Sequence, residues 1–282
     1  MTTFGQRLWQ ALDTHGPLCV GIDPHESLLQ SWGLPVSADG VREFGLRVVD
    51  AAAGRVGVVK PQVAFFERFG SRGFAALEDV LAAARAAELI VIADAKRGDI
   101  GSTMDGYAAA WLQPGSPLEA DAVTLSPYLG PDSLQQTLTF ALRHGKGAFV
   151  LAATSNPEAE PVQTAVTADA AAEEGERVAA RVARDAGWHN VGLPGALGSV
   201  GVVIGATVTR SRFGLSDILL AGTPILAPGF GAQGADPAEL GRLFGYVSSQ
   251  VIANESRSVL AVGPDRLADR IAERAALYGE RS

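Results

Sequence analysis

The sequence predicts a single (β/α)8 barrel spanning residues 1–282, and three observations support this prediction. Short runs rich in Val, Ile, Leu and Ala recur eight times, and most are followed by a turn and a helical pattern. The runs are continuously apolar, as expected of parallel strands covered on both faces. A length of 282 residues suits one barrel with modest insertions. An open doubly wound sheet is the alternative, but no Gly-x-Gly-x-x-Gly follows the first run.

The predicted elements alternate along the whole chain. The eight strands are expected at residues 18–23, 56–60, 89–94, 122–126, 148–154, 200–206, 224–228 and 258–262. Amphipathic segments predict outer helices at residues 40–53, 73–87, 133–143, 170–186 and 237–252. Segments 24–38 and 156–169 are longer than simple connections, so they are candidate lids over a site at the strand ends.

Composition limits the classes of function. Apolar residues make up 47% of the chain, which is enough for a large core, and a net charge of −8 argues against a nucleic-acid or anionic-membrane partner. The single cysteine, Cys19, lies in an apolar run and is expected to pack there, which fits a reducing cytoplasm. No secretory signal and no long uncharged apolar run is visible, so we expect a cytoplasmic protein that does not span a membrane.

Charged residues follow the predicted strands. Asp94 and Lys96 are two residues apart at the end of a strand, so their side chains should point to the same side of it. Asp99 follows after a turn, Thr103 lies one helical turn further, and Lys60 ends the preceding strand. Two carboxylates, Asp94 and Asp99, are therefore expected to bracket an ammonium group.

These charges have two possible interpretations. They could be ordinary ion pairs that stabilise loops, but five of them fall at the ends of the first three strands: Asp23, Lys60, Asp94, Lys96 and Asp99. A lysine flanked by carboxylates is held cationic, which suits a proton donor better than an amine nucleophile. The pattern thus predicts a site that stabilises a developing carbanion and then protonates it.

A second group lies near the C-terminus. The glycine-rich stretch 227–234 follows the seventh predicted strand, and its backbone N–H groups could approach a phosphate closely, with Gln233 adding an amide donor. Arg257 opens the predicted eighth strand. Barrels often bind phosphate with the loops after strands seven and eight. The alternative is a simple glycine-rich turn and a surface arginine.

The array Asp94-x-Lys96-x-x-Asp99-x-x-x-Thr103, preceded by Lys60, resembles that of the orotidine 5'-phosphate decarboxylase family. Longer strings resemble the bacterial subgroup that includes the actinobacterial members, in order over nearly the whole chain. They are Gly21-Ile-Asp-Pro-His25 and the stretches 59–67, 94–101, 126–130 and 154–157.

This resemblance implies a cofactor-free decarboxylation of orotidine 5'-phosphate (OMP) to UMP and CO2, without a metal. Lys96 matches the proton donor to C6 of the pyrimidine, and Asp94 matches the carboxylate that faces the substrate's own carboxylate. Lys60 and Asp23 resemble groups that bind the ribose and connect the charges.

The resemblance also implies residues for binding and assembly. Asp99 and Thr103 match residues that reach into the neighbouring subunit's site, which implies a homodimer. Ser155 matches the hydroxyl that reads the pyrimidine edge, while Gln233 and Arg257 match the phosphate grip. The second half of the chain matches less tightly, and Arg257 is assigned mainly by its position.

Three alternatives remain open at this point. A sugar-phosphate decarboxylase or epimerase of the same superfamily shares an Asp-x-Lys-x-x-Asp pattern but uses a metal-stabilised enediolate. A Schiff-base aldolase would use Lys96 or Lys60 as its nucleophile. A non-catalytic nucleotide-binding barrel would have no use for the charge array. The four histidines show no metal-ligand spacing.

Overall fold

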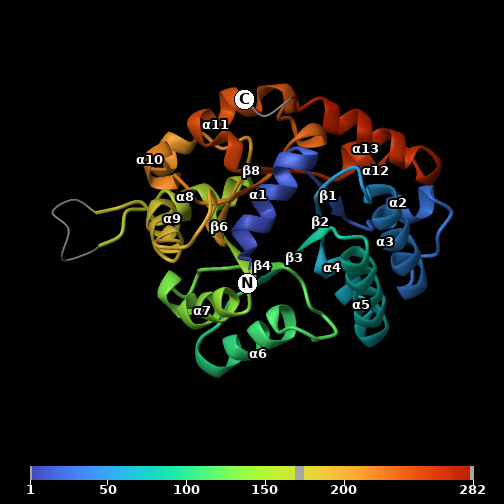
Figure 1. Ribbon diagram of the computed structural model, residues 1–282, viewed down its shortest axis with the longest axis horizontal. Helices are drawn as coiled ribbons and strands as arrows, with labels where there is room; N and C mark the ends of the chain where they lie inside the picture. The colour runs from blue at the N-terminus through green and yellow to red at the C-terminus, as the bar shows by residue number, and fades with distance from the viewer. Residues whose placement is uncertain (1, 169–174, 280–282) are drawn as a thin grey trace.

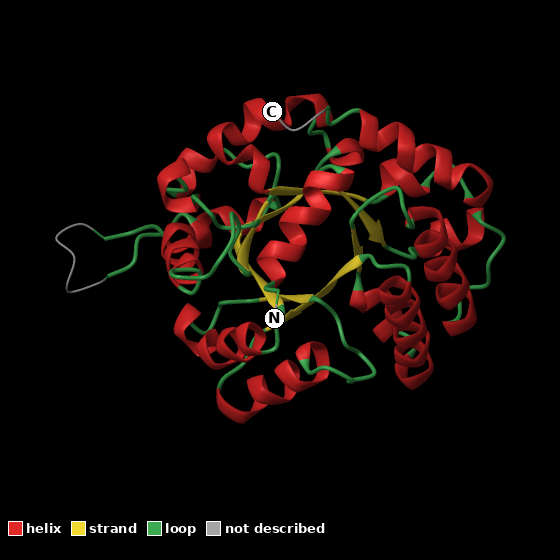
Figure 2. Ribbon diagram, viewed as in Figure 1, coloured by secondary structure: helices red, strands yellow, loops and turns green. Residues whose placement is uncertain are grey.

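Eight parallel strands form one closed barrel in this computed structural model (Figure 1). The structure describes residues 2–168 and 175–279. Figure 2 shows the strands as a yellow ring with helices around it. Each strand pairs in parallel with the next along the chain, and β8 pairs with β1 to complete the ring. The predicted (β/α)8 barrel is confirmed.

Seven of the eight strands overlap the residues predicted for them. The strands are β1 (Leu18–Ile22), β2 (Val58–Pro61), β3 (Ile90–Arg97), β4 (Ala122–Leu125), β5 (Gly147–Ala153), β6 (Val200–Ile204), β7 (Ile225–Pro228) and β8 (Val251–Glu255). Most of their residues are buried because the barrel interior is packed on one face and the helices cover the other.

The helices follow the alternating order that a barrel requires. In the first half they are α1 (Phe4–His15), α2 (Glu26–Ser31), α3 (Ala38–Ala52), α4 (Val63–Glu67), α5 (Gly70–Ala86), α6 (Gly101–Leu112) and α7 (Gln135–Arg143). In the second half they are α8 (Glu160–Gln163), α9 (Val178–Trp188), α10 (Asp217–Leu220), α11 (Leu240–Phe244), α12 (Arg257–Leu260) and α13 (Leu267–Ala276). The predicted helix 170–186 corresponds to α9 from Val178 on, and residues 170–174 lie outside the described residues.

The eighth strand was predicted in the wrong place. Residues 258–262, expected as a strand, belong partly to α12, whose Val259 and Leu260 are buried. The predicted helix 237–252 is broken, because its last two residues begin β8. The run 251–255 pairs with β7 and β1, so it has neighbours on both sides. Arg257 therefore follows the strand instead of opening it, and it lies in the loop region after β8.

Helix α1 closes the amino-terminal end of the barrel, and Figure 1 shows it crossing the ring of strands. Phe4 packs edge-on against Phe149 in the barrel interior, with ring centroids 6.1 Å apart. Gly147, the first residue of β5, leaves room for Phe4, because a Cβ there would lie 2.3 Å from the Phe4 ring. Since this end is filled, a ligand has access to the barrel axis from the carboxyl ends of the strands.

The structure also bears on the predictions for Cys19, for the two candidate lids and for membrane-spanning helices. Cys19 is fully buried in the core that fills the barrel, so its expected packing role is confirmed. The two candidate lids follow β1 and β5 and contain the short helices α2 and α8; residue 169 lies outside the described part. In residues 2–168 and 175–279, no helix is long and apolar enough to cross a membrane.

Candidate active site

One carboxylate lies between two ammonium groups at the carboxyl ends of β2 and β3. Lys60 Nζ is 2.7 Å from Asp94 Oδ2, and Lys96 Nζ is 2.6 Å from Asp94 Oδ1. Lys60 and Asp94 are buried, whereas the Lys96 side chain is 44% exposed. We call these three residues the charged triad. Its exposed member, Lys96, lines the inner cavity described below.

The backbone of β3 bends where the charged triad is built. Lys96 adopts a left-handed conformation with φ of 47°, which is unfavourable for a residue with a Cβ. The register between β3 and β4 shifts between Ala93 and Arg97, and Asp94 and Lys96 lie inside this irregularity. Such distortions of strands and strained backbones concentrate at functional sites.

Thr124 of β4 holds the bend in place. Its Oγ1 accepts a hydrogen bond from the Lys96 backbone N at 2.9 Å and donates to Asp94 Oδ1 at 3.0 Å. The Gln62 amide, oriented to satisfy both of its groups, donates to the Asp94 carbonyl oxygen and accepts from Lys96 Nζ. Neither Thr124 nor Gln62 was predicted from the sequence. The available signal was one polar residue within the apolar run of β4, and one directly after β2.

The charges of the triad hold one another ionised. Burial disfavours an ionised Asp94, but Lys60 and Lys96 outweigh it and hold the pKa of Asp94 well below its usual value. Burial also disfavours the Lys60 ammonium, but Asp94 and then Asp23 outweigh it and raise the pKa of Lys60. Asp23 carries a buried Oδ1 that has no hydrogen-bond partner. This oxygen is an unsatisfied hydrogen-bond acceptor beside the triad.

The arrangement reverses one expectation. The sequence suggested two carboxylates around one ammonium, but the described residues show the opposite, since Asp99 makes no ion pair with the triad. The Asp99 backbone N lies 3.2 Å from Met104 Sδ, and its Oδ1 accepts from the Ile100 backbone N. Thr103 lies exposed in the first turn of α6. The reason is that β3 ends at Arg97, so Asp99 lies in the following loop and Thr103 lies in α6.

Two adjoining cavities open beside the triad. The inner cavity has a volume of about 290 Å³ and contains the triad. Its other polar lining residues are Asp23, Gln62, Thr124, Thr154, Ser155, Asn156, Gln233 and Asn254. The outer cavity, of about 580 Å³, is lined by Gln233 and Arg257 together with His25, Ser27 and Ser256. Asp23, Gln233 and Asn254 line both, so the two cavities are direct neighbours.

Most predicted site residues therefore line these two cavities. Ser155 lines the inner cavity together with the triad, and Gln233 and Arg257 line the outer one. Arg257 reaches it from the first residue of α12. Asn254 of β8 was missed because the strand itself was misplaced.

The glycine-rich loop (residues 229–234) forms one wall of the outer cavity. Gly229, Gly231 and Gly234 have φ values of 119°, 68° and 111°, which favour glycine. The loop contains a short turn of 3-10 helix and closes back through a hydrogen bond from Gly231 N to the Ala235 carbonyl oxygen. Gly229, Phe230, Ala232 and Gln233 of this loop line the outer cavity together with Arg257.

A third cavity, of about 550 Å³, lies at the opposite end of the barrel beside α1. Four of its charged residues form ion pairs: Arg7 contacts Asp121 at 2.6 Å, and Lys146 contacts Glu119 at 2.6 Å. Because these pairs neutralise each other and lie away from the carboxyl ends of the strands, we assign the candidate site to the two adjoining cavities.

Comparisons with known proteins identify the family of this chain. The family model described as Orotidine 5'-phosphate decarboxylase / HUMPS family matches residues 16–267. The orotidine 5'-phosphate decarboxylase of Corynebacterium glutamicum (strain R) is 51% identical over 263 residues, which cover 93% of this chain and 92% of that protein. The Streptomyces coelicolor protein of that name is also 51% identical, over 96% of this chain and 95% of its own length.

Solved structures give the same result. A crystal structure from Streptomyces avermitilis, provisionally assigned as an orotidine 5'-phosphate decarboxylase, has a TM-score of 0.91 and 49% identity, covering 99% of this chain and 95% of that one. The OMP decarboxylase of Leishmania donovani has a TM-score of 0.77 and 30% identity, with complete coverage of both chains.

The triad geometry makes a prediction about stability. Asp94→Asn should lower the free energy of unfolding at pH 7 by about 3–5 kcal/mol, because the buried Lys60 ammonium loses the carboxylate to which it is hydrogen-bonded. The folded-state pKa of Asp94 is depressed, so its contribution is complete above 3.8, the ordinary value, and is lost as the pH falls below it. Urea unfolding of both proteins at a series of pH values measures this difference.

The difference between wild type and Asp94→Asn should be constant from about pH 5 to about pH 7 and shrink on further acidification. Asp13→Asn, at an exposed position in α1, is the control and should change the free energy little. A difference that shrinks already between pH 7 and pH 5 would contradict the strong coupling of Asp94 to the lysines.

Proposed function

This chain belongs to the orotidine 5'-phosphate decarboxylase / HUMPS family, and from that premise we propose that it converts OMP to UMP and CO2 with Lys96 as the proton donor. It is a carboxy-lyase of pyrimidine biosynthesis, as its relatives at 51% identity are. The observation that carries the proposal is the buried Asp94 carboxylate between Lys60 and Lys96 at the wall of a substrate-sized space. We propose further that residues 1–282 form one catalytic domain that works in the cytoplasm.

The two cavities suggest how the substrate binds. The 5'-phosphate would occupy the outer cavity, where the Arg257 guanidinium and the Gln233 amide can donate to its oxygens. The pyrimidine would occupy the inner cavity, with its edge against Ser155 and C6 toward the triad. The ribose would lie at the junction, where Asp23 and Lys60 could bind its hydroxyls. Asp23 supports this placement with its unpartnered buried oxygen.

The reaction follows from this placement. The bond between C6 and the carboxylate breaks, CO2 leaves, and the electron pair remains on C6. Lys96 Nζ stabilises that pair by its charge and then donates a proton to C6, which gives UMP; solvent returns a proton to the amine. Because the charges are already fixed by the fold, little reorganisation is needed as the carbanion develops.

Each neighbour of Lys96 has a proposed role in this step. Asp94 would face the substrate's carboxylate and disfavour the bound reactant by repulsion, which CO2 loss relieves. Lys60 keeps Asp94 ionised, as the depressed pKa of Asp94 indicates. Thr124 and Gln62 orient Asp94 and Lys96 by the hydrogen bonds described above.

We also propose a homodimer in which Asp99 and Thr103 complete the partner's site. Asp99 lies at the mouth of the barrel without an ion-pair partner among the described residues. Beside it, Ile100 in the loop after β3 and Tyr128 and Leu129 in the loop after β4 are exposed apolar side chains. An exposed apolar group at the end of two neighbouring strands is typical of a contact surface. A second copy of this chain would cover it and bring in Asp99.

The proposed decarboxylation can be measured directly. Purified protein should consume OMP, seen as loss of the orotate absorbance, and form equimolar UMP and CO2 in the presence of EDTA. Lys96→Ala should reduce kcat by more than about 10³-fold, since it removes both the charge and the proton. Lys96→Arg should also be inactive, because a guanidinium does not give up its proton readily.

Circular dichroism spectra should show that both variants remain folded. Retention of near-normal turnover by Lys96→Ala would disprove the proton-donor role. Loss of wild-type activity in EDTA, restored by a divalent metal, would favour the enediolate chemistry of a sugar-phosphate enzyme instead.

Arg257→Ala tests the phosphate grip. The variant should raise KM for OMP by at least about tenfold, because it removes a charge-assisted contact to the dianion. Added guanidinium cation should recover part of the lost activity by occupying the space that the Arg257 side chain has left. An unchanged KM together with no response to guanidinium would remove Arg257 from the site.

Mixing two inactive variants tests the shared site. Lys96→Ala and Asp99→Asn should each be inactive alone, but a hybrid dimer would hold one site with both native residues. After random exchange of subunits, half of the dimers are hybrids with one competent site of two, so about a quarter of the wild-type activity should return. No recovery, with exchange verified by mass spectrometry of tagged chains, would place Asp99 in its own subunit's chemistry.

A further inference from the structure

A buried network of polar groups lies behind the glycine-rich loop. Its centre is Glu255, the last residue of β8, which is only 1% exposed. Arg274 of α13 donates two hydrogen bonds to it, from Nε at 2.8 Å and from Nη2 at 2.9 Å. Tyr278 Oη donates to Glu255 Oε1 at 2.7 Å, and Ser258 Oγ donates to Oε2. The carboxylate is thus fully partnered by groups from α12 and from the C-terminal segment (residues 267–279).

The contacts of the Glu255 carboxylate are costly to break because it is a buried charge. A buried carboxylate is tolerated only when its oxygens are paired and hydrogen-bonded, so loss of Arg274 would leave an expensive charge. Burial, reinforced by the charge of Glu255 and the hydrogen bond to it, raises the pKa of Tyr278 above its usual value. Tyr278 therefore stays a hydrogen-bond donor at all physiological pH values.

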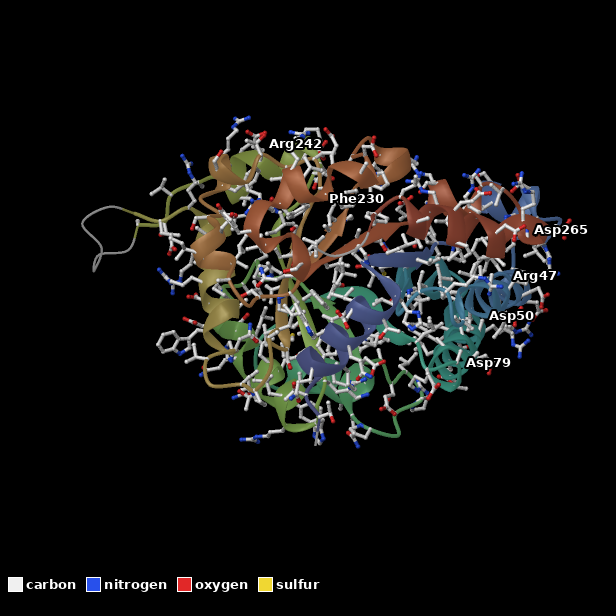
Figure 3. The ribbon with its side chains drawn as sticks, turned by 45° about the horizontal axis from the view of Figure 1, so that its top comes forward. Arg47, Asp50, Asp79, Phe230, Arg242 and Asp265 are labelled. Atoms are coloured by element: carbon white, nitrogen blue, oxygen red, sulfur yellow. The ribbon has the colours of Figure 1, made fainter. Side chains whose placement is uncertain are left out.

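The glycine-rich loop rests directly on this network. A Cβ at Gly231 would lie 2.6 Å from Glu255 Oε2 and 2.6 Å from Ser258 Oγ, so the loop backbone is in close contact with both side chains. The loop's Phe230, labelled in Figure 3, is buried, and the Tyr278 ring meets it edge-on with centroids 5.6 Å apart. Tyr278 thus contacts both the loop and the carboxylate beneath it.

Arg257 is held by the same groups. It lies between Glu255 and Ser258 in sequence, and these two residues are joined by their own hydrogen bond. The backbone on either side of Arg257 is therefore fixed, while its side chain remains exposed at the outer cavity. Neither Arg274 nor Tyr278 lines the inner or the outer cavity. Their influence on a ligand must pass through the loop and α12.

We propose that Arg274 and Tyr278 are positioning residues for the 5'-phosphate, acting through Glu255 on the glycine-rich loop and on Arg257. The proposal rests on the proposed function for the identity of the substrate. The C-terminal segment would thereby fix the position of the glycine-rich loop relative to Arg257. Changes in this segment should alter how much the substrate's phosphate contributes to catalysis and leave the chemistry at the triad unchanged.

The test compares a substrate with its phosphate-free counterpart. We expect Arg274→Met to lower kcat/KM for OMP by at least about tenfold, because small misplacements of binding groups have large effects on rate. The value for orotidine, which has no phosphate, should stay within about twofold of wild type. Tyr278→Phe, which removes one hydroxyl and keeps the ring against Phe230, should raise KM for OMP about threefold to tenfold. Arg266→Met, an exposed control beside α13, should change neither substrate.

Binding gives a second measurement that needs no turnover. Calorimetry should show weaker binding of UMP to both variants and unchanged binding of uridine. Equal losses for the phosphorylated and the phosphate-free ligands, or no loss for either, would overturn the proposal. Wild-type turnover of OMP tests the proposed function separately, because the comparison of UMP with uridine stands whether or not decarboxylation occurs.

Discussion

The attraction of one buried carboxylate, Asp94, for two ammonium groups is the interaction on which the site depends. It lies at the ends of β2 and β3, and it requires the threonine of β4 to hold a strained backbone at Lys96. The rest of the barrel makes this arrangement stable. Helix α1 fills the other end, and the strands around the triad are buried on both faces. A fixed pattern of charge is therefore available before any ligand arrives, which is the condition for electrostatic stabilisation of a carbanion.

The outer cavity depends on a loop and on contacts between residues that are far apart in the sequence. The glycine-rich loop and Arg257 form the wall of the outer cavity, and the network centred on Glu255 holds both of them. This separation fits the proposed function, in which the loop and Arg257 bind the phosphate and the triad takes part in the reaction. Binding energy at a phosphate can then be used to order the reacting groups and exclude water. The carboxyl-end loops after β1 and β5 frame the opening between these two sides.

The sequence predicted the barrel and most residues that line the candidate site, because both depend on short-range patterns. Apolar runs located seven strands, and the spacing of two residues correctly placed Asp94 and Lys96 on the same side. The eighth strand failed because residues 258–262 are as apolar as 251–255, and only pairing with β7 and β1 distinguishes them. The left-handed turn at Lys96 and the bond from Thr124 have no local signature. The contact of Arg274 with Glu255 joins separate elements, so no spacing rule could reveal it.

The central claim is that the Lys96 cation stabilises an electron pair at C6. By microscopic reversibility, the same group should remove the C6 proton of bound UMP, so the most direct measurement is deuterium incorporation at C6 of UMP in D2O, followed by NMR. The account predicts exchange that depends on wild-type protein and disappears in Lys96→Ala, while UMP still binds the variant. Equal exchange with the variant, or none with the wild type at saturating UMP, would contradict it.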